Sequence, residues 1–291
     1  MSYRLLYSTL KLISYIPFPL LYLLSDCLGW VLYHLVRYRR RIVRRNLTEC
    51  FPEKGLPEIR KIEKGFYRYF TDNVLESCKL ASISPDEMKR RMRFTNIEEV
   101  NDVLRSGRSV ALYLGHYANW EWISSMPLHL EKEAVAAQIY HKLRNRNFDR
   151  LMLHIRSRMG AVCVDMYKTA RYITELRTAG KVCIVGFIAD QSPKKKEVRH
   201  FIDFMHHRTP VLTGTEKIIK HYDFEAWFVR TRRVKRGYYE VEYIKMHPDP
   251  KSLPDFELTE IYYRMLADMI ISDPTLYLWT HNRFKHAQLE K

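Results

Sequence analysis

The chain has 291 residues, of which 46% are hydrophobic and 13% aromatic, so it is long enough for one large α/β domain and too apolar for a disordered protein. Its formal net charge of +16 predicts anionic partners. No nucleic-acid-binding motif accompanies this charge, and many of the basic residues adjoin apolar sequence. A membrane surface is therefore favoured over nucleic acid.

Residues 1–46 are expected to form a membrane anchor. Two uncharged runs, residues 12–25 and 27–36, flank Asp26. Neither reaches the roughly 20 residues that a spanning helix needs, and two prolines in the first run would interrupt a helix. Two short helices lying in one leaflet are favoured. A tilted span and a buried pair of core helices are the alternatives.

A cluster of six arginines follows the second apolar run directly. Positive charge in this position is typical of cytoplasmic juxtamembrane sequence, which is attracted to anionic lipid headgroups. The cluster consists of Arg37, Arg39, Arg40, Arg41, Arg44 and Arg45.

Residues 47–291 are expected to form a single α/β domain. Residues 56–80 show the apolar spacing of a helix pair. From residue 109 onward apolar runs alternate with amphipathic stretches, which predicts a mixed central sheet flanked by helices, with a hairpin turn at Arg236-Gly237. Strands are expected at 109–114, 134–140, 161–164, 182–188, 226–230 and 238–244, and helices at 120–129, 147–159, 169–179, 214–221 and 258–271.

His116 and Glu121 directly follow the apolar run that ends at Leu114, and α/β enzymes often place their chemistry at such strand ends. On one helix the two side chains would lie about 140° apart. They can meet if His116 lies on the turn and Glu121 in the first helical turn, with Asn119 as the helix N-cap. A carboxylate beside the imidazole would then fix its tautomer and stabilise the imidazolium. On spacing alone, a strand-end histidine near a capping glutamate is the alternative.

Residues 115–121, Gly-His-Tyr-Ala-Asn-Trp-Glu, resemble the Gly-His-X-Gly-Asn-Trp-Glu signature of the bacterial lipid A biosynthesis (late) acyltransferases. That family is part of the wider group of glycerolipid acyltransferases marked by His-X4-Asp/Glu. Ala118 stands where the family usually has glycine. The resemblance runs nearly end to end, through Phe148-Asp149-Arg150-Leu151, Arg156-X-Arg158-X-Gly160, Asp190-Gln191-Ser192-Pro193, Thr213-Gly214 and the closing Trp279-Thr280-His281-Asn282-Arg283-Phe284-Lys285.

The resemblance implies transfer of a fatty acyl chain from acyl carrier protein to a hydroxyl of a lipid A precursor, at the cytoplasmic face of the bacterial inner membrane. It implies that His116 is the general base and that Glu121 orients it. Backbone N–H groups of the following helix, or a nearby arginine, would stabilise the oxyanion. No metal and no other cofactor is expected.

Further candidate substrate contacts are Asn119, Arg156, Arg158 and Asp190. The two arginines cannot point the same way on a helix, and Arg156 is favoured as a phosphate ligand, with a solvated basic helix end as the alternative. Asp190 follows a second apolar strand and is expected to line the groove. A basic run after it suits an acidic carrier protein, namely Lys194, Lys195 and Lys196.

Other catalytic chemistries lack support in the sequence. The five cysteines occur singly, which argues against a zinc site or a disulfide framework. His206-His207 is expected in a surface loop and not at a metal. No Gly-X-Ser-X-Gly nucleophile motif is present, so a covalent acyl-enzyme is not expected.

Two alternative functions stay open. One is an acyltransferase with the same mechanism and another acceptor, such as a lysophospholipid, an aminolipid or a pigment alcohol. The other is a non-catalytic basic membrane protein that binds lipid or nucleic acid.

Overall fold

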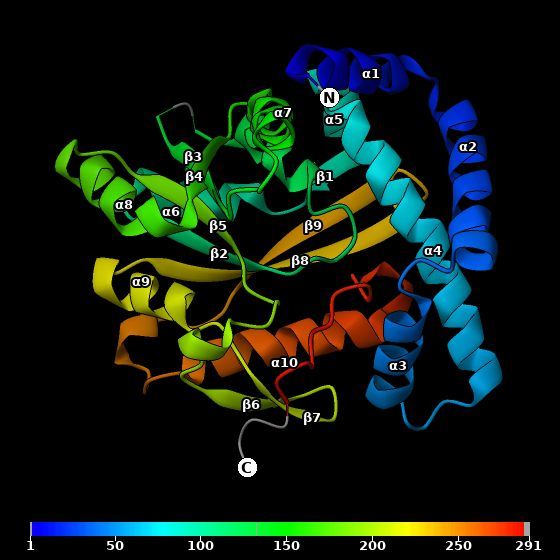
Figure 1. Cartoon of the computed structure of the whole chain (residues 1–291). Helices are drawn as coiled ribbons and strands as arrows, with labels where there is room; N and C mark the ends of the chain where they lie inside the picture. The colour runs from blue at the N-terminus through cyan, green and yellow to red at the C-terminus, as the bar shows by residue number, and fades with distance from the viewer. Residues whose placement is uncertain (1, 132, 288–291) are drawn as a thin grey trace.

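The computed structural model describes residues 2–131 and 133–287, and its centre is a seven-stranded mixed sheet (Figure 1). The strand order is β1-β9-β8-β2-β5-β3-β4. The expected α/β architecture with a mixed sheet is confirmed. The strands are β1 (Met92–Phe94), β2 (Val110–Leu114), β3 (Val135–Tyr140), β4 (Val162–Asp165), β5 (Cys183–Ile188), β8 (Glu225–Lys235) and β9 (Tyr238–Lys245).

Strand β2 lies in the middle of this sheet, and all five of its residues are buried. It pairs in parallel with β5 on one side and with β8 on the other. Strands β8 and β9 are antiparallel and joined at Gly237, whose positive φ of 74° suits a tight turn. The continuous apolar sequence of β2 follows from its central position, because both of its faces are covered.

Helices cover both faces of the sheet. In the view of Figure 1, α9 and α10 lie below the sheet, and α7 lies above it together with α1 and α5. The helices that follow the N-terminal segment are α4 (Leu56–Lys79), α5 (Pro85–Arg91), α6 (Ile97–Arg105), α7 (Arg146–Ser157), α8 (Thr169–Thr178), α9 (Gly214–Tyr222) and α10 (Glu257–Ser272). Shorter 3₁₀ helices are η2 (Trp122–His129), η3 (Met166–Lys168), η4 (Lys195–Glu197), η5 (Pro250–Ser252) and η6 (Pro274–Leu276).

The N-terminal helices wrap around the long helix α4, as Figure 1 shows. They are α1 (Tyr3–Tyr15), α2 (Phe18–Val31) with its π-helical continuation η1 (Leu32–Val36), and α3 (Arg40–Cys50). The inward face of α2 repeats at every fourth residue, with Leu21, Ser25 and Gly29 buried. A Cβ on Gly29 would lie 3.0 Å from the Thr71 Oγ1, so glycine permits the close approach of α2 to α4.

Polar contacts fasten α2 to the rest of the chain. The Ser25 hydroxyl donates to the Asp72 carboxylate of α4 at 2.6 Å. Arg236, at the tip of the β8–β9 hairpin, donates both to Asp72 and to Asp26 of α2. Asp26 therefore does not divide two membrane helices, as the sequence suggested. It lies within one helix and pairs with Arg236 of the same chain.

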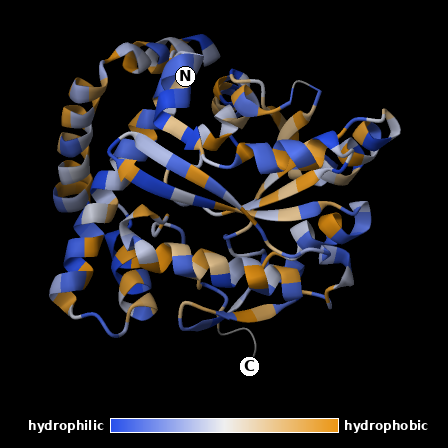
Figure 2. Ribbon diagram, turned by 180° about the vertical axis from the view of Figure 1, so that it is seen from behind, coloured by the Kyte–Doolittle hydropathy of each residue, from blue (hydrophilic) through white to orange (hydrophobic). Residues whose placement is uncertain are grey.

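The outward face of α2 is apolar. Figure 2 shows hydrophobic residues along this helix at the edge of the molecule. Residues 18–36 form one helix that is long and apolar enough, by length and composition, to cross a membrane. The interruption between α1 and α2 at Pro17 agrees with the sequence. The second interruption, expected near Asp26, does not occur within α2. Exposed apolar side chains here are Leu20, Leu23, Leu24, Leu28 and Trp30.

Several sequence-based assignments need correction. Residues 56–79 form one continuous helix and not a helix pair. The segment after Glu121 is a 3₁₀ helix, with Pro127 inside it. The loop expected around His206-His207 is the turn and second strand of a hairpin formed by β6 (Phe201–Phe204) and β7 (His207–Pro210). Strand β1 and helices α5 and α6 were not anticipated, because short elements carry too little apolar periodicity to stand out.

We expect that deleting residues 1–46 abolishes cooperative folding, although the sequence suggested a separable anchor. The deletion would expose buried positions of α4 and leave Asp72, 2% exposed, without its Ser25 partner. Thermal unfolding followed by circular dichroism is the measurement. A soluble truncated chain with a sharp transition would restore the view that this segment is peripheral.

Candidate active site

His116 lies two residues beyond the end of β2, and Asp190 lies two residues beyond the end of β5. The two strands are parallel neighbours with Leu114 opposite Ile188, so both side chains emerge at the same edge of the sheet. There the imidazole Nδ1 and the carboxylate Oδ1 of Asp190 are 2.7 Å apart. The structure thus brings a base and a carboxylate together at a strand end, as expected, but with Asp190 as the carboxylate.

Asp190 is suited to remain ionised. Its burial alone would raise the pKa of the carboxyl group, but the neighbouring His116, through charge and a hydrogen bond, holds the pKa below its ordinary value. An ionised Asp190 accepts the Nδ1–H of a neutral imidazole. This tautomer leaves Nε2 unprotonated and able to accept a proton from a substrate.

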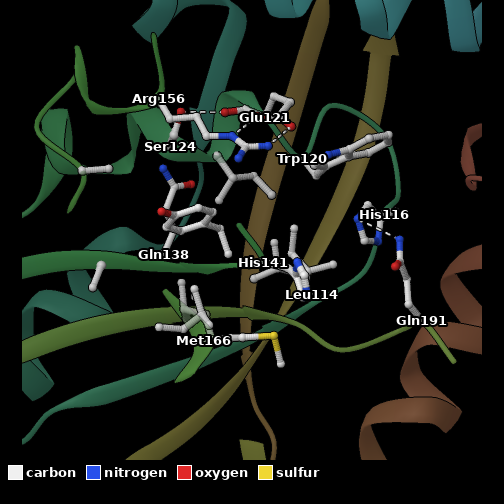
Figure 3. A pocket seen from close by; sticks show the side chains of 18 of the residues that line it. Leu114, His116, Trp120, Glu121, Ser124, Gln138, His141, Arg156, Met166 and Gln191 are labelled. Atoms are coloured by element: carbon white, nitrogen blue, oxygen red, sulfur yellow. Dashed lines mark hydrogen bonds and ion pairs between the residues drawn. The ribbon is translucent and has the colours of Figure 1, made fainter. Parts of the chain in front are cut away.

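Glu121 is not the hydrogen-bond partner of the imidazole; its carboxylate pairs with Arg156 of α7. The guanidinium donates from Nε to Oε2 at 2.7 Å and from Nη2 to Oε1 at 2.6 Å, a two-pronged ion pair. The expectation that Glu121 orients His116 is therefore corrected. The indole of Trp120 packs edge-on against the imidazole, with ring centres 5.2 Å apart, while the next residue turns toward α7 (Figure 3).

The same ion pair bears on the expected role of Arg156. Its fork was predicted to hold a substrate phosphate, but two of its three nitrogens are engaged by Glu121. Arg158, the residue that follows the end of the same helix, points elsewhere, as predicted, and donates to the backbone carbonyls of Leu80 and Ile83. Arg158 thus ties α7 to the chain that follows α4, away from the cavity.

A cavity of about 490 Å³ opens beside His116, within the size range typical of ligand sites. Figure 3 shows His116 and Gln191 at one end and the Glu121–Arg156 pair along the wall. The amide Nε2 of Gln191 is 3.4 Å from the imidazole Nε2. The inner lining is mostly apolar and includes Leu112, Ile123, Met126, Ala136, Ala137, Ala161, Gly186 and Ile188.

The loop between β2 and η2, residues 115–121, is held from behind by helix α4. The Tyr69 hydroxyl and the Asn73 amide both donate to the Ala118 carbonyl, at 2.6 and 2.7 Å. Ala118 has a positive φ of 50°, a conformation in which glycine, the family's usual residue here, avoids steric cost. The two hydrogen bonds keep alanine in this conformation.

Glu76 extends this support. Its carboxylate accepts from Tyr239 at 2.8 Å, from Tyr22 of α2 at 2.9 Å and from Asn119 at 2.7 Å. Asn119 is fully buried, and its side-chain oxygen accepts from the Trp122 N–H. The capping contact expected for Asn119 is present, but the side chain faces Glu76 and does not line the cavity, which differs from the expected substrate contact.

The α4 residues behind the loop were missed as site residues in the sequence. Tyr69, Asn73 and Glu76 are spaced so that they share one face of a helix, and all three are buried. An amide and a carboxylate on an otherwise apolar helical face are the signal that could have identified them, because buried polar groups require partners.

The C-terminal strap, defined here as residues 279–282, closes the other side of the site. The backbone N–H of Ser192 donates to the imidazole Nε2 of His281 at 3.4 Å. Burial lowers the pKa of His281 to about 4, so this imidazole stays neutral and can accept. Within residues 2–131 and 133–287, no group of three or more His, Cys, Asp or Glu side chains could hold a metal ion.

Comparison with known proteins identifies the family. Residues 3–286 match the bacterial lipid A biosynthesis acyltransferases. The chain belongs to this family. It is 25% identical to the lipid A biosynthesis lauroyltransferase of Escherichia coli (strain K12) over 284 residues, 95% of this chain and 89% of that one. It is 27% identical to lipid A biosynthesis acyltransferase 2 of Shigella flexneri over 127 residues, 43% of this chain and 40% of that one.

The expected family is thereby confirmed, and the protein is an acyltransferase of lipid A biosynthesis. The family implies a lipid A-type acceptor. The alternative of a non-catalytic basic membrane protein is not favoured by these matches.

We expect Glu76→Gln to flatten the dependence of stability on pH. Burial raises the pKa of Glu76 to about 7 despite its three donors. The folded protein therefore holds this proton more tightly than the unfolded chain, so stability is greatest below the unfolded pKa and falls as the pH rises toward 7. The loss amounts to about 3 kcal/mol.

Urea unfolding of both proteins at pH 5 and pH 8 measures this effect. The difference between the two pH values should be smaller in Glu76→Gln, whose neutral amide has no proton to lose. If the free energy of unfolding changed equally between pH 5 and pH 8 in both proteins, ionisation of Glu76 would not destabilise the fold, which would contradict the prediction.

Proposed function

We propose that this enzyme transfers a fatty acyl chain from acyl carrier protein to a hydroxyl of a lipid A precursor, with His116 as general base. The observation that carries the proposal is the His116–Asp190 pair, 2.7 Å apart, at the end of an apolar cavity. A base at the end of an apolar cavity suits the attack of a hydroxyl on the thioester of a long acyl chain.

In the proposed reaction, the acceptor hydroxyl gives its proton to His116 Nε2 as its oxygen attacks the thioester carbonyl carbon. The imidazolium is stabilised by Asp190. When the tetrahedral intermediate collapses, the carbon–sulfur bond breaks, and the departing thiolate takes the proton from His116. The base is thereby restored without any covalent acyl-enzyme. The acceptor hydroxyl would take the position now held by the amide nitrogen of Gln191, 3.4 Å from the imidazole Nε2.

The oxyanion is assigned to Arg156. Glu121 holds Nε and Nη2 of the guanidinium, which fixes its plane and leaves Nη1 for the carbonyl oxygen. A positioned donor of this kind stabilises charge that develops only in the transition state. In this proposal Glu121 orients Arg156, whereas the notion of a phosphate ligand at Arg156 is given up.

In this proposal the carrier protein docks at the basic run that follows Gln191. Lys194 lines the cavity mouth, and Lys195 and Lys196 follow it on an exposed turn. Acyl carrier proteins are acidic, so a basic surface at the mouth would attract them and direct the acyl chain inward. The apolar outer face of α2 would lie against the cytoplasmic leaflet of the inner membrane, where the acceptor lipid resides.

The order of variant activities tests the dyad. His116→Ala should lower kcat by at least about a hundredfold. Asp190→Asn should cause a comparable loss, because its amide can donate to Nδ1 and hold the imidazole in the tautomer whose Nε2 already carries a proton. Acyl transfer from acyl carrier protein, followed by mass spectrometry of the lipid product, is the measurement.

Glu121→Gln serves as the comparison. It leaves the imidazole tautomer unchanged and loosens only Arg156, so its loss should resemble that of Arg156→Lys. A near-normal rate for His116→Ala would contradict the role of His116 as general base. A near-normal rate for Asp190→Asn, together with a large loss in Glu121→Gln, would contradict the assignment of Asp190 as the partner of His116.

The cavity wall provides a second test. Gly186 lies on β5 beside the cavity, and a Cβ added there would lie 3.6 Å from the Leu114 side chain, an ordinary contact. Gly186→Val should therefore fold and should shift transfer toward shorter acyl chains, since added methyl groups occupy cavity volume. Competition between acyl carrier proteins with chains of different length measures the shift. Unchanged selectivity would place the acyl chain elsewhere.

A further inference from the structure

A basic hollow at the start of α3 has no role in the acyl-transfer chemistry proposed above. It is an open basin formed almost entirely by arginine side chains, and we call it the arginine basin. Its members are Arg37, Arg39, Arg40, Arg41, Arg44 and Arg45.

The positive charge of the basin is only partly compensated. Arg40 and Arg44 both pair with the fully buried carboxylate of Glu63. Arg37 and Arg41 are exposed, and neither has a partner among the residues that the structure describes. Two guanidiniums therefore face the basin with their hydrogen-bond donors available.

The backbone at the basin is strained. Arg37 and Arg39 have φ values of 53° and 49°, in the left-handed region that arginine rarely adopts. The Tyr67 hydroxyl donates to the carbonyl of Tyr38, between them, and so fixes the turn. Strain of this kind persists where the surrounding structure imposes it, often at ligand sites.

The basin is connected to the catalytic residues through the C-terminal strap. Arg39 donates to the Thr280 carbonyl, and Asn46 of α3 donates to the carbonyls of Trp279 and His281, each at 3.0 Å. His281 in turn accepts from Ser192, next to Gln191. The basin and His116 thus flank the same short segment.

Three other arginines that could have held a phosphate are engaged or enclosed. Arg156 is held by Glu121, Arg158 by backbone carbonyls, and Arg283 is only 1% exposed. Beside the basin, the end of η1 exposes Leu35 and Val36, at 65% and 60%. An apolar surface next to unpaired guanidiniums fits a lipid that carries phosphate.

We infer that the arginine basin binds a phosphate group of the acceptor glycolipid, with Arg37 and Arg41 as its principal ligands. This inference rests on the proposed function for the identity of the acceptor. The bound phosphate would orient the sugar so that the acceptor hydroxyl approaches His116. The acyl chain of the donor occupies the cavity on the other side of the imidazole.

The test uses the double variant Arg37→Gly/Arg41→Ala. Glycine at position 37 removes the guanidinium and suits the left-handed backbone, so this variant should unfold at a temperature no lower than the parent. The matched control, Lys181→Ala/Arg264→Ala, removes two exposed positive charges outside the basin.

Binding is measured in neutral detergent micelles, with His116→Ala added to each protein so that no turnover occurs. The probes are a phosphorylated lipid A precursor and the same lipid after phosphatase treatment. We expect the parent and the control to prefer the phosphorylated lipid by roughly tenfold or more, and the basin variant to lose that preference.

Binding to vesicles of phosphatidylcholine, with and without phosphatidylglycerol, separates the two sources of lipid phosphate. If the basin variant kept its preference in micelles and lost only its affinity for phosphatidylglycerol, the basin would be a general headgroup surface and the inference would be overturned. A parent without any preference would overturn it as well. Failure of the unaltered enzyme to transfer an acyl chain, with the preference intact, would refute the proposed function and leave the basin assignment standing.

Discussion

The parallel pairing of β2 with β5 is the constraint on which the candidate site depends. Because Leu114 lies opposite Ile188, the residues two positions further along each strand face each other across the sheet edge. His116 and Asp190, 74 positions apart in the sequence, become hydrogen-bond partners for this reason. A shift of one residue in register would turn one of the two side chains toward the other face of the sheet and separate the base from its carboxylate.

Helix α4 supplies the second constraint, since it holds the loop between β2 and η2 in a conformation that alanine adopts at a cost. Tyr69 and Asn73 share the Ala118 carbonyl, and Glu76 binds Asn119. These groups are buried, so removing one partner leaves another donor or acceptor unsatisfied, at a cost of about 1–3 kcal/mol. The loop that carries His116 is therefore held in one conformation by buried hydrogen bonds from a neighbouring helix.

The N-terminal helices share in this support and also provide the apolar outer surface. Tyr22 of α2 donates to the Glu76 carboxylate, which also accepts from Asn119. The helix with the exposed apolar face is therefore connected through Glu76 to the loop that carries His116. Asp26 and Arg236 fix the polar side of α2 toward the protein. This division of faces is typical of an amphipathic helix that lies at a membrane surface.

The sequence by itself determined the family, the α/β class, most of the strands of the main sheet and the strand-end position of His116, because these depend on local apolar periodicity and on a contiguous motif. It also indicated that Arg156 and Arg158 point in different directions, which helix geometry alone dictates. The partners of His116 and Glu121 at the candidate site were decided by tertiary structure. Spacing suggested Glu121 for His116, but strand register supplies Asp190 and the turn at Trp120 directs Glu121 to Arg156. Sequence proximity bounds which side chains can meet, whereas the packing of distant elements selects which of them do.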